Sequence, residues 1–591
     1  MLMLCRNEFP DEALAWLDAA TVLAGEDDVA FSRLLGTGGN FGRQELAVTY
    51  ISRVQSAFTD PRSRQWLHAL LAGEENVSYL RSPVGQFDPG RAGGIQSSPL
   101  EKADDTGFAN PWSFLFTLEG ALLFAAAVVR RHGAEYSEAA VPFQVRGATG
   151  GHATAAPDES VLGELWTPEW TAPARLEEIV QLLGEGRAEW NNHPARSGLD
   201  FARAVASLGV DRGIAAFERY VFVDRLGQNP LAIPADRMPV RRRESVLLLA
   251  DLDGWLDRIP RGSSANVAAR VRGVEQALFT HASSGETADF VEVLAALGRA
   301  HEAVATSGAA RRVVPPLVLP SGTAIADELE SVLGEDPELR VALALATAHD
   351  DPPEGERHRP TLHGLRPLLS PVTSEQHRPA WSKRPAASSL AAGPYQALAM
   401  AARRRAMPRS DDDQNDDVQP AVRGARIAFR HGRRLRTGDV RDLIDGMLDE
   451  RRVADLLAGL LTIDWRGAGR GSLSGKSASD VALDLLLPFS STEPVKVAVA
   501  DGSCVPKLFR PGHQWPALLA AGRADEVLDD AARRLRISGI PHVIRPHHHS
   551  SNGERLAAAL LTRVREPDVE HALRRVGVLP PTTTDADKEP A

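Results

Sequence analysis

The most apolar stretch of this 591-residue chain is the feature that most restricts its fold. It reads SFLFTLEGALLFAAAVV, from Ser113 to Val129, and contains one acidic residue, Glu119. A membrane-spanning helix needs about 20 apolar residues without a charge, so this stretch is too short and too polar to cross a bilayer. Asn110 and Pro111 precede it, in the order typical of an N-cap and a first helical residue. We therefore predict a helix buried in a protein core here, and no membrane partner.

The bulk composition is that of an ordinary globular protein. Hydrophobic residues make up 43% and charged residues 25% of the chain, and this length predicts about two to four domains. The two cysteines, Cys5 and Cys504, form no C-x-x-C pair, so a disulfide framework or cysteine–zinc site is unsupported and a cytoplasmic location fits. The net charge of −11 argues against a uniformly basic surface but leaves local basic patches open.

Apolar periodicity predicts an α+β fold. The segment FERYVFVDRLGQNPLAIPADRMPV is typical of a β-hairpin with its turn at Leu226–Pro230. Helical patterns cover DEALAWLDAATVLA and ARLEEIVQLLGEG, and from about Glu244 successive helical patterns predict bundles. We predict five regions: a mixed N-terminal domain with a small antiparallel β element (1–243), a helical domain (244–406), a charged linker (407–424), a C-terminal helical domain (425–579) and a disordered tail (580–591).

The segment LGTGGNFGRQE near the N-terminus is dense in glycine. A dinucleotide-binding fingerprint needs G-x-G-x-x-G between a strand and a helix; Gly36 and Gly38 fit, but Phe41 occupies the third position. Two interpretations stay open. One is a tight turn that uses the positive φ angles of Gly-Gly-Asn. The other is a loop that approaches nucleic acid through Asn40 and Arg43, which can donate to bases and phosphates.

Three segments resemble catalytic or metal-binding motifs, and each departs from its pattern. GRGSLSGKS lacks the first glycine of a phosphate loop, where Arg470 stands, and follows a helical pattern instead of a strand. His349-Asp350 matches the core of a His-Asp phosphohydrolase, which also needs a separated His and Asp. Three consecutive histidines, 547–549, cannot all face one ion from regular structure. We predict no cofactor, metal or catalytic residue, with a His-Asp metal-dependent phosphohydrolase or nuclease as the rival hypothesis.

Clusters of arginine are candidates for phosphate contacts. Arg403, Arg404 and Arg405 end a predicted helix that also carries Tyr395, and six arginines lie between residues 423 and 436. Arginine beside an aromatic ring suits a nucleic-acid backbone. A run of charge is equally typical of a solvated face. We take Arg403, Arg404 and Arg405 as the predicted non-specific strand-binding residues.

Five segments, in this order, resemble the large subunit of the type I-G CRISPR effector complex, formerly called type I-U. They are LLGTGGNFGR, VGQFDPGRAGG, NPWSFLFTLEGALLFAAAVVRR, AVPFQVR and ARSGLDFARAVASLGVDRGIAAFERYVFV, which lie between residues 10 and 240. The helical remainder matches more loosely. The family's glycine loop usually reads Gly-Gly-Asn-Asp-Gly, and here Phe41 stands at the aspartate. Members of the family generally carry a further segment at the N-terminus.

The resemblance implies a role in a ribonucleoprotein complex rather than a reaction. Such a subunit is expected to help recognise the protospacer-adjacent motif, to bind and open double-stranded target DNA, and to recruit a helicase-nuclease. Its expected partners are crRNA, target DNA, the helicase-nuclease and the other subunits of the complex. Guide pairing carries the sequence information, so the protein needs only backbone contacts and a few base-edge donors.

We predict DNA contacts from residues in glycine-rich or polar loops and beside glycine-containing turns: Asn40, Arg43, Gln96, Ser97, Ser98, Arg146, Arg196 and Arg212. A purely architectural subunit, which binds proteins and never DNA, is the second rival hypothesis.

Overall fold

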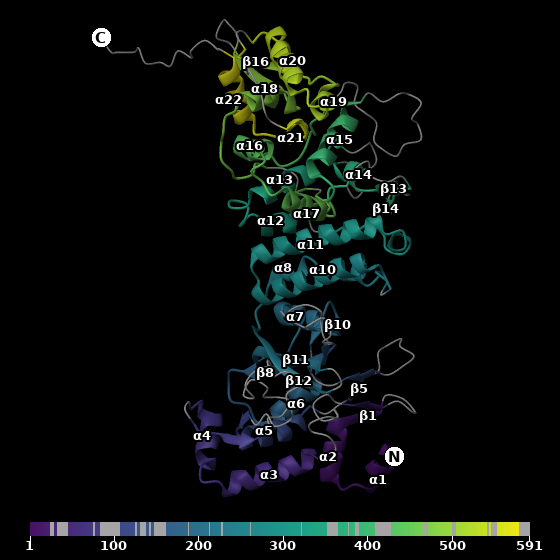
Figure 1. The fold of residues 1–591 in the computed structure, drawn as a ribbon, viewed down its shortest axis with the longest axis vertical. Coiled ribbons are helices and arrows are strands. Elements are labelled where there is room, and N and C mark those ends of the chain that lie inside the picture. The colour runs from purple at the N-terminus through teal and green to yellow at the C-terminus, as the bar shows by residue number, and fades with distance from the viewer. Residues whose placement is uncertain are drawn as a thin grey trace, which may run out of the picture. The chain divides into compact units, whose positions relative to one another are not determined.

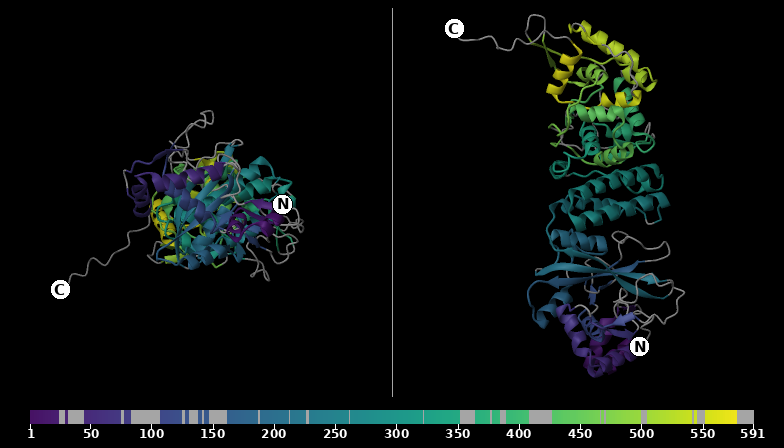
Figure 2. Two further views of the ribbon diagram at one scale, coloured as in Figure 1. Left: turned by 90° about the horizontal axis from the view of Figure 1, so that it is seen from below. Right: turned by 60° about the vertical axis from the view of Figure 1, so that its left-hand side comes forward.

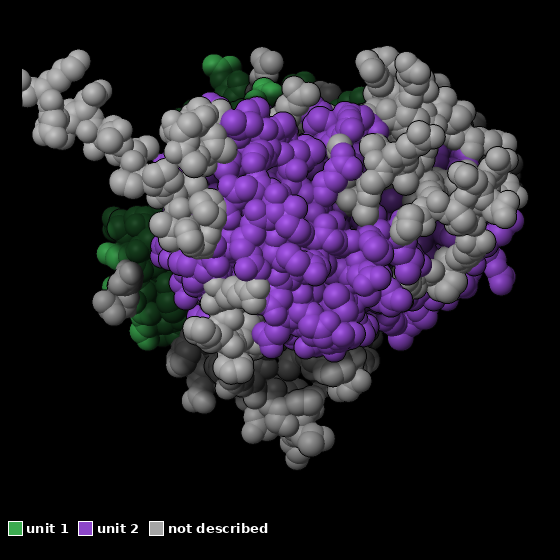
Figure 3. Space-filling model, turned by 90° about the horizontal axis from the view of Figure 1, so that it is seen from above, with its two compact units in different colours: residues 1–246 green, residues 247–591 purple. Residues whose placement is uncertain are grey.

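In the computed structural model, the chain forms two compact units, residues 1–246 and residues 247–591, which Figure 3 shows in different colours. Unit 1 mixes helices with small antiparallel sheets and unit 2 is mostly helical, so the predicted α+β fold class is confirmed. The structure describes the whole chain except residues 24–28, 32–44, 75–76, 83–106, 125–126, 130–137, 141–142, 147–160, 187, 212, 226–227, 261, 321, 352–363, 376–377, 384–388, 408–426, 466, 469–470, 499–503, 541–542, 545–551 and 578–591.

A four-stranded antiparallel sheet organises unit 1 (Figure 1). Its strands lie in the order β12 (Gln228–Pro239), β11 (Ile214–Arg225), β8 (Val161–Trp170) and β7 (Gln144–Val145). Strands β11 and β12 form the predicted hairpin, with Arg225 paired to Gln228 at its end. The turn is therefore shorter than the predicted turn at Leu226–Pro230.

Helices pack on both faces of this sheet, because successive side chains of a strand point to opposite faces. One face joins α5 (Pro111–Ala121) in a core cluster of Ala121, Leu165, Phe222 and Ala232. On the other face, Phe201 of α7 (Gly198–Ser207) stacks on Trp166 with ring centroids 4.6 Å apart. Phe201 also contacts Phe217 edge-on, with centroids 5.1 Å apart. Neighbouring residues of one strand therefore contact different helices: Leu165 packs with α5, and Trp166 packs with α7.

Helix α5 begins as predicted and ends earlier than predicted. The Asn110 side chain accepts a hydrogen bond from the Trp112 amide at 3.1 Å, and Pro111 is the first helical residue. The helix ends at Ala121, however, and β5 (Ala127–Val129) pairs with β6 (Glu138–Ala140). The prediction of one helix as far as Val129 is therefore wrong at its C-terminal end, where two β-branched valines favour a strand.

The helices predicted in DEALAWLDAATVLA and ARLEEIVQLLGEG are present. The first ends at Ala20, since residues 21–23 form a strand. The remaining elements of unit 1 are α1 (Leu2–Glu8), α2 (Asp11–Ala20), β1 (Thr21–Leu23), β2 (Val29–Phe31), α3 (Glu45–Thr59), α4 (Ser63–Ala72), β3 (Leu80–Ser82), β4 (Gly107–Ala109), α6 (Leu176–Glu185), β9 (Glu189–Trp190) and β10 (His193–Pro194), and α8 (Glu244–Leu247) reaches the boundary.

Three long helices pack closely in unit 2. Helices α10 (Ala265–Ser284) and α11 (Thr287–Thr306) are joined by a short turn and lie side by side (Figure 2). Helix α11 crosses α17 (Glu450–Leu460) where Gly298 meets Gly459. A Cβ atom on Gly459 would lie 1.9 Å from the carbonyl oxygen of Leu294, so this crossing requires glycine.

The segments predicted as two helical domains form one unit. Helix α15 (Pro394–Ala406) packs against α19 (Trp515–Ala520) and α21 (Gly553–Ala559), and α13 (Pro337–Ala346) packs against α17. The predicted linker falls almost entirely, and the predicted tail entirely, outside the described residues. The remaining elements are η2 (Ala250–Leu252), α9 (Asp253–Leu256), η3 (Ala310–Arg312), α12 (Gly322–Leu329), α14 (Arg366–Leu369), β13 (Val372–Glu375), β14 (Arg378–Trp381), α16 (Thr437–Asp445), α18 (Val481–Ser490), β15 (Val495–Ala498), β16 (Cys504–Lys507), α20 (Ala524–Ile537) and α22 (Glu566–Val576).

Within the described ranges, no helix has the length and apolar character needed to cross a bilayer.

Candidate nucleic-acid interface

The structure places five of the eleven residues predicted to contact nucleic acid. Arg146 and Arg196 lie in unit 1, and Arg403, Arg404 and Arg405 lie in unit 2. The other six lie outside the described residues and stay predictions: Asn40, Arg43, Gln96, Ser97, Ser98 and Arg212.

The fold brings Arg146 and Arg196 together from distant parts of the sequence. The Arg146 amide donates to the Arg196 carbonyl oxygen, and the Gly198 amide donates to the Arg146 carbonyl oxygen, each at 3.1 Å. These two bonds hold both arginines beside the first turn of α7. Both residues are exposed, and neither guanidinium has an ion-pair partner among the residues that the structure describes. The backbones of two exposed arginines from different segments thus meet at the start of α7.

The start of α7 is capped by its own side chains. The Ser197 hydroxyl accepts from the Asp200 amide at 3.2 Å, and the Asp200 carboxylate accepts from the amides of Arg196 (3.0 Å) and Ser197 (3.2 Å). This reciprocal arrangement is a capping box. The carboxylate satisfies the amides and adds a negative charge, so an anion here would be bound by the two guanidinium groups and not by the amides that Asp200 already bonds.

An asparagine turn leads into Arg196. Strands β9 and β10 pair Trp190 with His193, and Asn191 and Asn192 between them have φ angles of 50° and 63°. Two positive φ angles in a two-residue loop are typical of a type I′ turn, which asparagine tolerates. Both asparagines are exposed, and their amides can bond base edges or phosphates. The sequence-based predictions did not include this turn, although Asn-Asn between short strands was a usable signal.

A buried ion pair lies directly under the start of α7. Arg219 of β11 donates from Nε (2.8 Å) and Nη2 (2.7 Å) to the carboxylate of Glu164 on β8, and both side chains are 0% exposed. Trp166 Nε1 donates to the same carboxylate at 3.1 Å. A Cβ atom at Gly198 would lie 2.1 Å from Glu164 Oε2, so the first helical position must be glycine. The pair therefore sets how closely the first turn of α7 approaches the sheet. It thereby also sets the position of Arg146 and Arg196 beside that turn.

Neither member of this pair was predicted from the sequence. Both occupy inward positions of strands, and a charge at an inward position was the available signal. Only strand pairing, which sets Arg219 opposite Trp166 and near Glu164, reveals that the two charges meet.

The three arginines at the end of α15 have different surroundings. Arg403 and Arg404 are exposed and stay candidates for strand binding. Arg405 donates from Nη2 to Asp350 at 2.9 Å and from Nε to a backbone carbonyl oxygen at 2.7 Å, and its guanidinium carbon lies 3.6 Å from the ring centroid of Phe429. Burial lowers the pKa of Arg405. Arg405 is therefore a packing residue of unit 2, which corrects its prediction as a strand-binding residue.

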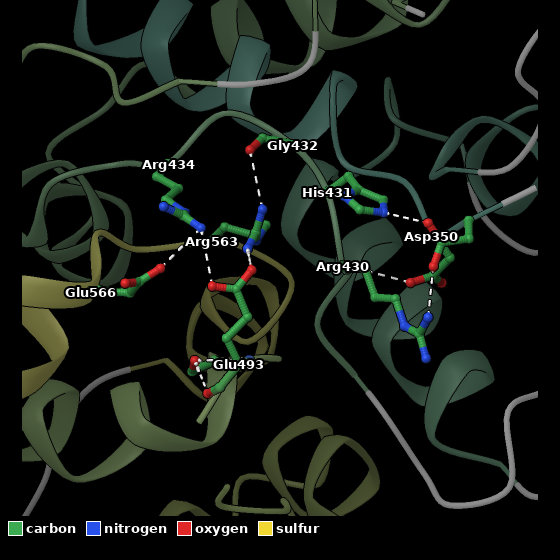
Figure 4. Close-up of polar contacts among 10 residues, drawn as sticks. Asp350, Arg430, His431, Gly432, Arg434, Glu493, Arg563 and Glu566 are labelled. Atoms are coloured by element: carbon green, nitrogen blue, oxygen red, sulfur yellow. Dashed lines mark hydrogen bonds and ion pairs between the residues drawn. The ribbon is translucent and has the colours of Figure 1, made fainter. Parts of the chain in front are cut away.

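The arginine-rich segment that follows the predicted linker is also paired within unit 2. The described ion pairs are Arg430–Asp351 (2.6 Å), Arg433–Glu330 (3.0 Å), Arg434–Glu566 (3.1 Å), Arg434–Glu493 (3.4 Å) and Arg436–Asp568 (3.5 Å). Figure 4 shows Arg434 and Arg563 converging on Glu493. These four arginines pair with carboxylates of their own chain, and their interpretation as a nucleic-acid track stays a prediction. Arg423 and Arg426 lie outside the described residues.

The His349-Asp350 pair has structural partners. His349 Nδ1 lies 2.8 Å from the Thr347 carbonyl oxygen, and Asp350 accepts from Arg405 and from the Arg430 amide. Burial lowers the pKa of His349. No group of three or more His, Cys, Asp or Glu side chains suited to a metal ion occurs in the part of the chain that the structure describes. Both residues of the motif thus have hydrogen-bond partners within unit 2, and the His-Asp phosphohydrolase stays a rival hypothesis.

The phosphate-loop-like segment also has structural contacts. It follows helix α17 rather than a strand, as predicted. The Leu473 amide donates to the Arg434 carbonyl oxygen, and the Gly438 amide donates to the Lys476 carbonyl oxygen. The backbone of this segment is therefore used in packing beside α16.

Comparison with known proteins assigns no family. No protein-family model matches the chain, and a search of curated proteins gives no significant match. Functional inference therefore rests on the sequence resemblance and on the geometry around Arg146 and Arg196.

Proposed function

We propose that this protein is the non-catalytic large subunit of a crRNA-guided type I CRISPR surveillance complex. In this role it helps recognise the protospacer-adjacent motif, binds and opens target DNA, and recruits the helicase-nuclease. The observation that carries the proposal is the meeting of two resembling segments. Arg146 ends AVPFQVR, Arg196 lies at the start of ARSGLDFARAVASL, and the two exposed arginines stand beside one helix terminus.

The chemistry at this place suits a nucleic-acid backbone. A guanidinium group offers a rigid fork of donors that matches a phosphate, and two of them can engage neighbouring phosphates. The exposed Asn191 and Asn192 add neutral donors and acceptors close in sequence. Such a small cationic site agrees with the overall net charge of −11, because guide pairing leaves only backbone and a few base contacts to the protein.

The first experiment tests membership of the complex. The tagged chain is purified from cells that carry its native gene neighbourhood, and the bound RNA and proteins are sequenced. We expect a repeat-derived guide RNA and companion subunits, encoded beside a CRISPR array. Recovery of the chain without any guide RNA would refute the proposal. So would a metal-dependent nuclease or phosphatase activity that His349→Ala abolishes.

The second experiment tests DNA binding at the proposed place. Binding of the assembled complex to a labelled target duplex is measured across a salt series, with wild-type chain and with an Arg146→Gln/Arg196→Gln variant. Each lost phosphate contact flattens the slope of log K against log salt by about 0.9, so we expect the slope to fall by about 2.

Arg237→Gln is the matched control. Arg237 is an exposed arginine of β12, in the four-stranded sheet of unit 1, but it already pairs with Glu169 at 2.6 Å. We expect its substitution to leave the salt slope unchanged. A double variant with wild-type affinity and slope would instead favour the purely architectural subunit.

A further inference from the structure

The turn between β9 and β10 has asparagine where the backbone geometry favours glycine. Asn191 and Asn192 have φ angles of 50° and 63°. A two-residue turn with two positive φ angles is most often Asn-Gly, because glycine has no Cβ to crowd the backbone. Among the described residues only four besides glycine have a positive φ, and two of them are adjacent here. Residues held in such sparsely populated conformations cluster at functional sites. The second asparagine carries a conformational cost that glycine would avoid, which points to a use for its side chain.

The short ribbon of β9 and β10 is held in place behind this turn. The Glu189 amide donates to the Gly209 carbonyl oxygen at 2.6 Å, and a Cβ atom on Gly209 would lie 1.9 Å from the Glu189 carbonyl oxygen. The guanidinium carbon of Arg203, on α7, lies 5.0 Å from the ring centroid of Trp190, which precedes the turn. The ribbon therefore carries the turn on a fixed base beside α7 (Figure 1).

Both carboxamide groups of the turn are open to a ligand. Asn191 and Asn192 are exposed, and neither side chain has a hydrogen-bond partner within the part of the chain that the structure describes. No acidic residue occurs from Trp190 to Arg196. A carboxamide offers a carbonyl acceptor and two N–H donors. The turn therefore presents two neutral donor–acceptor groups, and no carboxylate within this segment repels a negatively charged backbone.

We propose that Asn191 and Asn192 read adenine in the major groove of target DNA, and so determine the base preference of the site that Arg146 and Arg196 anchor. The inference rests on the proposed function, because it takes duplex DNA as the ligand. An asparagine carboxamide accepts a hydrogen bond from N6 of adenine and donates one to N7, a pair of contacts that only adenine offers in this groove. The major groove admits a two-stranded β-ribbon, whereas the minor groove presents A·T and T·A alike.

The spacing between the turn and the arginine fits one groove. Asn192 and Arg196 are four residues apart, so their Cα atoms lie within about 14 Å of each other. The major groove is about 12 Å wide. An arginine on a phosphate that borders the groove thus leaves the turn within reach of the base edges. In protein–DNA complexes, phosphate contacts fix the register and base contacts carry the sequence information. The arginines supply contacts of the first kind, and the asparagines supply contacts of the second kind.

A library of target duplexes, randomised beside the guide-matched sequence, tests this readout on the assembled complex. We expect the complex with wild-type chain to favour adenine at one or two of the randomised positions. Asn191→Gly and Asn192→Gly preserve the turn, since glycine adopts a positive φ readily, and each should relax the adenine preference by about tenfold or more. The salt dependence of binding should stay unchanged, because neither substitution removes a phosphate contact.

Leu208→Gly is the matched control. Leu208 also has a positive φ, 62°, and is 49% exposed, but it has no carboxamide. It directly precedes Gly209, which bonds to the same ribbon. The substitution therefore makes the same backbone change close to the turn, and we expect the base preference of wild type.

Replacing the preferred adenine by 7-deazaadenine tests the contact at one atom. The analogue lacks the N7 acceptor and still pairs with thymine, so it should weaken binding to the wild-type complex and should not weaken binding to the glycine variants further. A wild-type complex without an adenine preference, glycine variants that keep the preference in full, or no effect of the 7-deaza base overturns this inference. If the Arg146→Gln/Arg196→Gln variant still shows the reduced salt slope, the proposed function stands without it. A complex that binds no target DNA refutes both.

Discussion

Replacing Arg219 by methionine tests whether the buried ion pair supports the candidate interface. Methionine keeps much of the apolar volume of the arginine stem, so the substitution removes mainly the charge and the donors. The Glu164 carboxylate then stays 0% exposed and loses its hydrogen bonds at 2.8 and 2.7 Å. Gly198 lies against this carboxylate, which leaves little room for water to replace the guanidinium.

The expected cost is large. Removing one partner of a buried ion pair destabilises a protein by about 3–5 kcal/mol, because the other charge stays buried and uncompensated. Since about 1.4 kcal/mol corresponds to a factor of ten in an equilibrium, the population of the opened state around β8, β11 and α7 should rise by roughly 10²- to 10³-fold or more.

Hydrogen exchange read by mass spectrometry measures this locally. Peptides from β8, β11 and α7 should exchange faster by that factor in Arg219→Met, whereas peptides from α11 in unit 2 serve as the internal control. Glu164→Met/Arg219→Met removes both charges and should recover much of the loss, because an apolar pair of similar volume is tolerated where a lone charge is not. Exchange within about threefold of wild type in the single variant, or equal loss in both variants, would refute this reasoning.

Three further outcomes are expected in unit 2. Arg405→Ala should cost about 2–4 kcal/mol in urea unfolding, since it breaks a charge-assisted pair and a cation–π contact, whereas Arg404→Ala should stay within about 0.5 kcal/mol. Burial lowers the pKa of His301 from 6.5 to about 3, so between these pH values the folded state binds fewer protons than the unfolded state. The free energy of unfolding therefore falls as pH falls from 6.5 toward 3. His301→Phe should reduce this loss in unfolding curves measured at several pH values. Burial acts to raise the pKa of Asp530, but hydrogen bonds from neighbouring arginines and Trp515 outweigh it and lower the pKa to about 2. Its stabilisation is therefore present above about pH 4 and lost as pH falls toward 2, and acid unfolding of Asp530→Asn should lack this component.

The sequence alone determined those elements whose cause is local. Asn110 and Pro111 set the start of α5, because a cap and a proline act within one turn. Alternating aromatic and β-branched residues determined the β11–β12 hairpin, and apolar spacing determined α10 and α11. In each case the residues that decide the structure are neighbours along the chain.

The tertiary structure alone decided what each charged residue does. Arg403, Arg404 and Arg405 are identical letters in the sequence, yet only Arg405 meets Asp350 and Phe429. The backbones of Arg146 and Arg196 meet, and Glu164 meets Arg219, only because strands and a helix from separate parts of the chain pack together. An arginine's free energy depends on whether water or a carboxylate surrounds it, and packing between distant segments sets those surroundings.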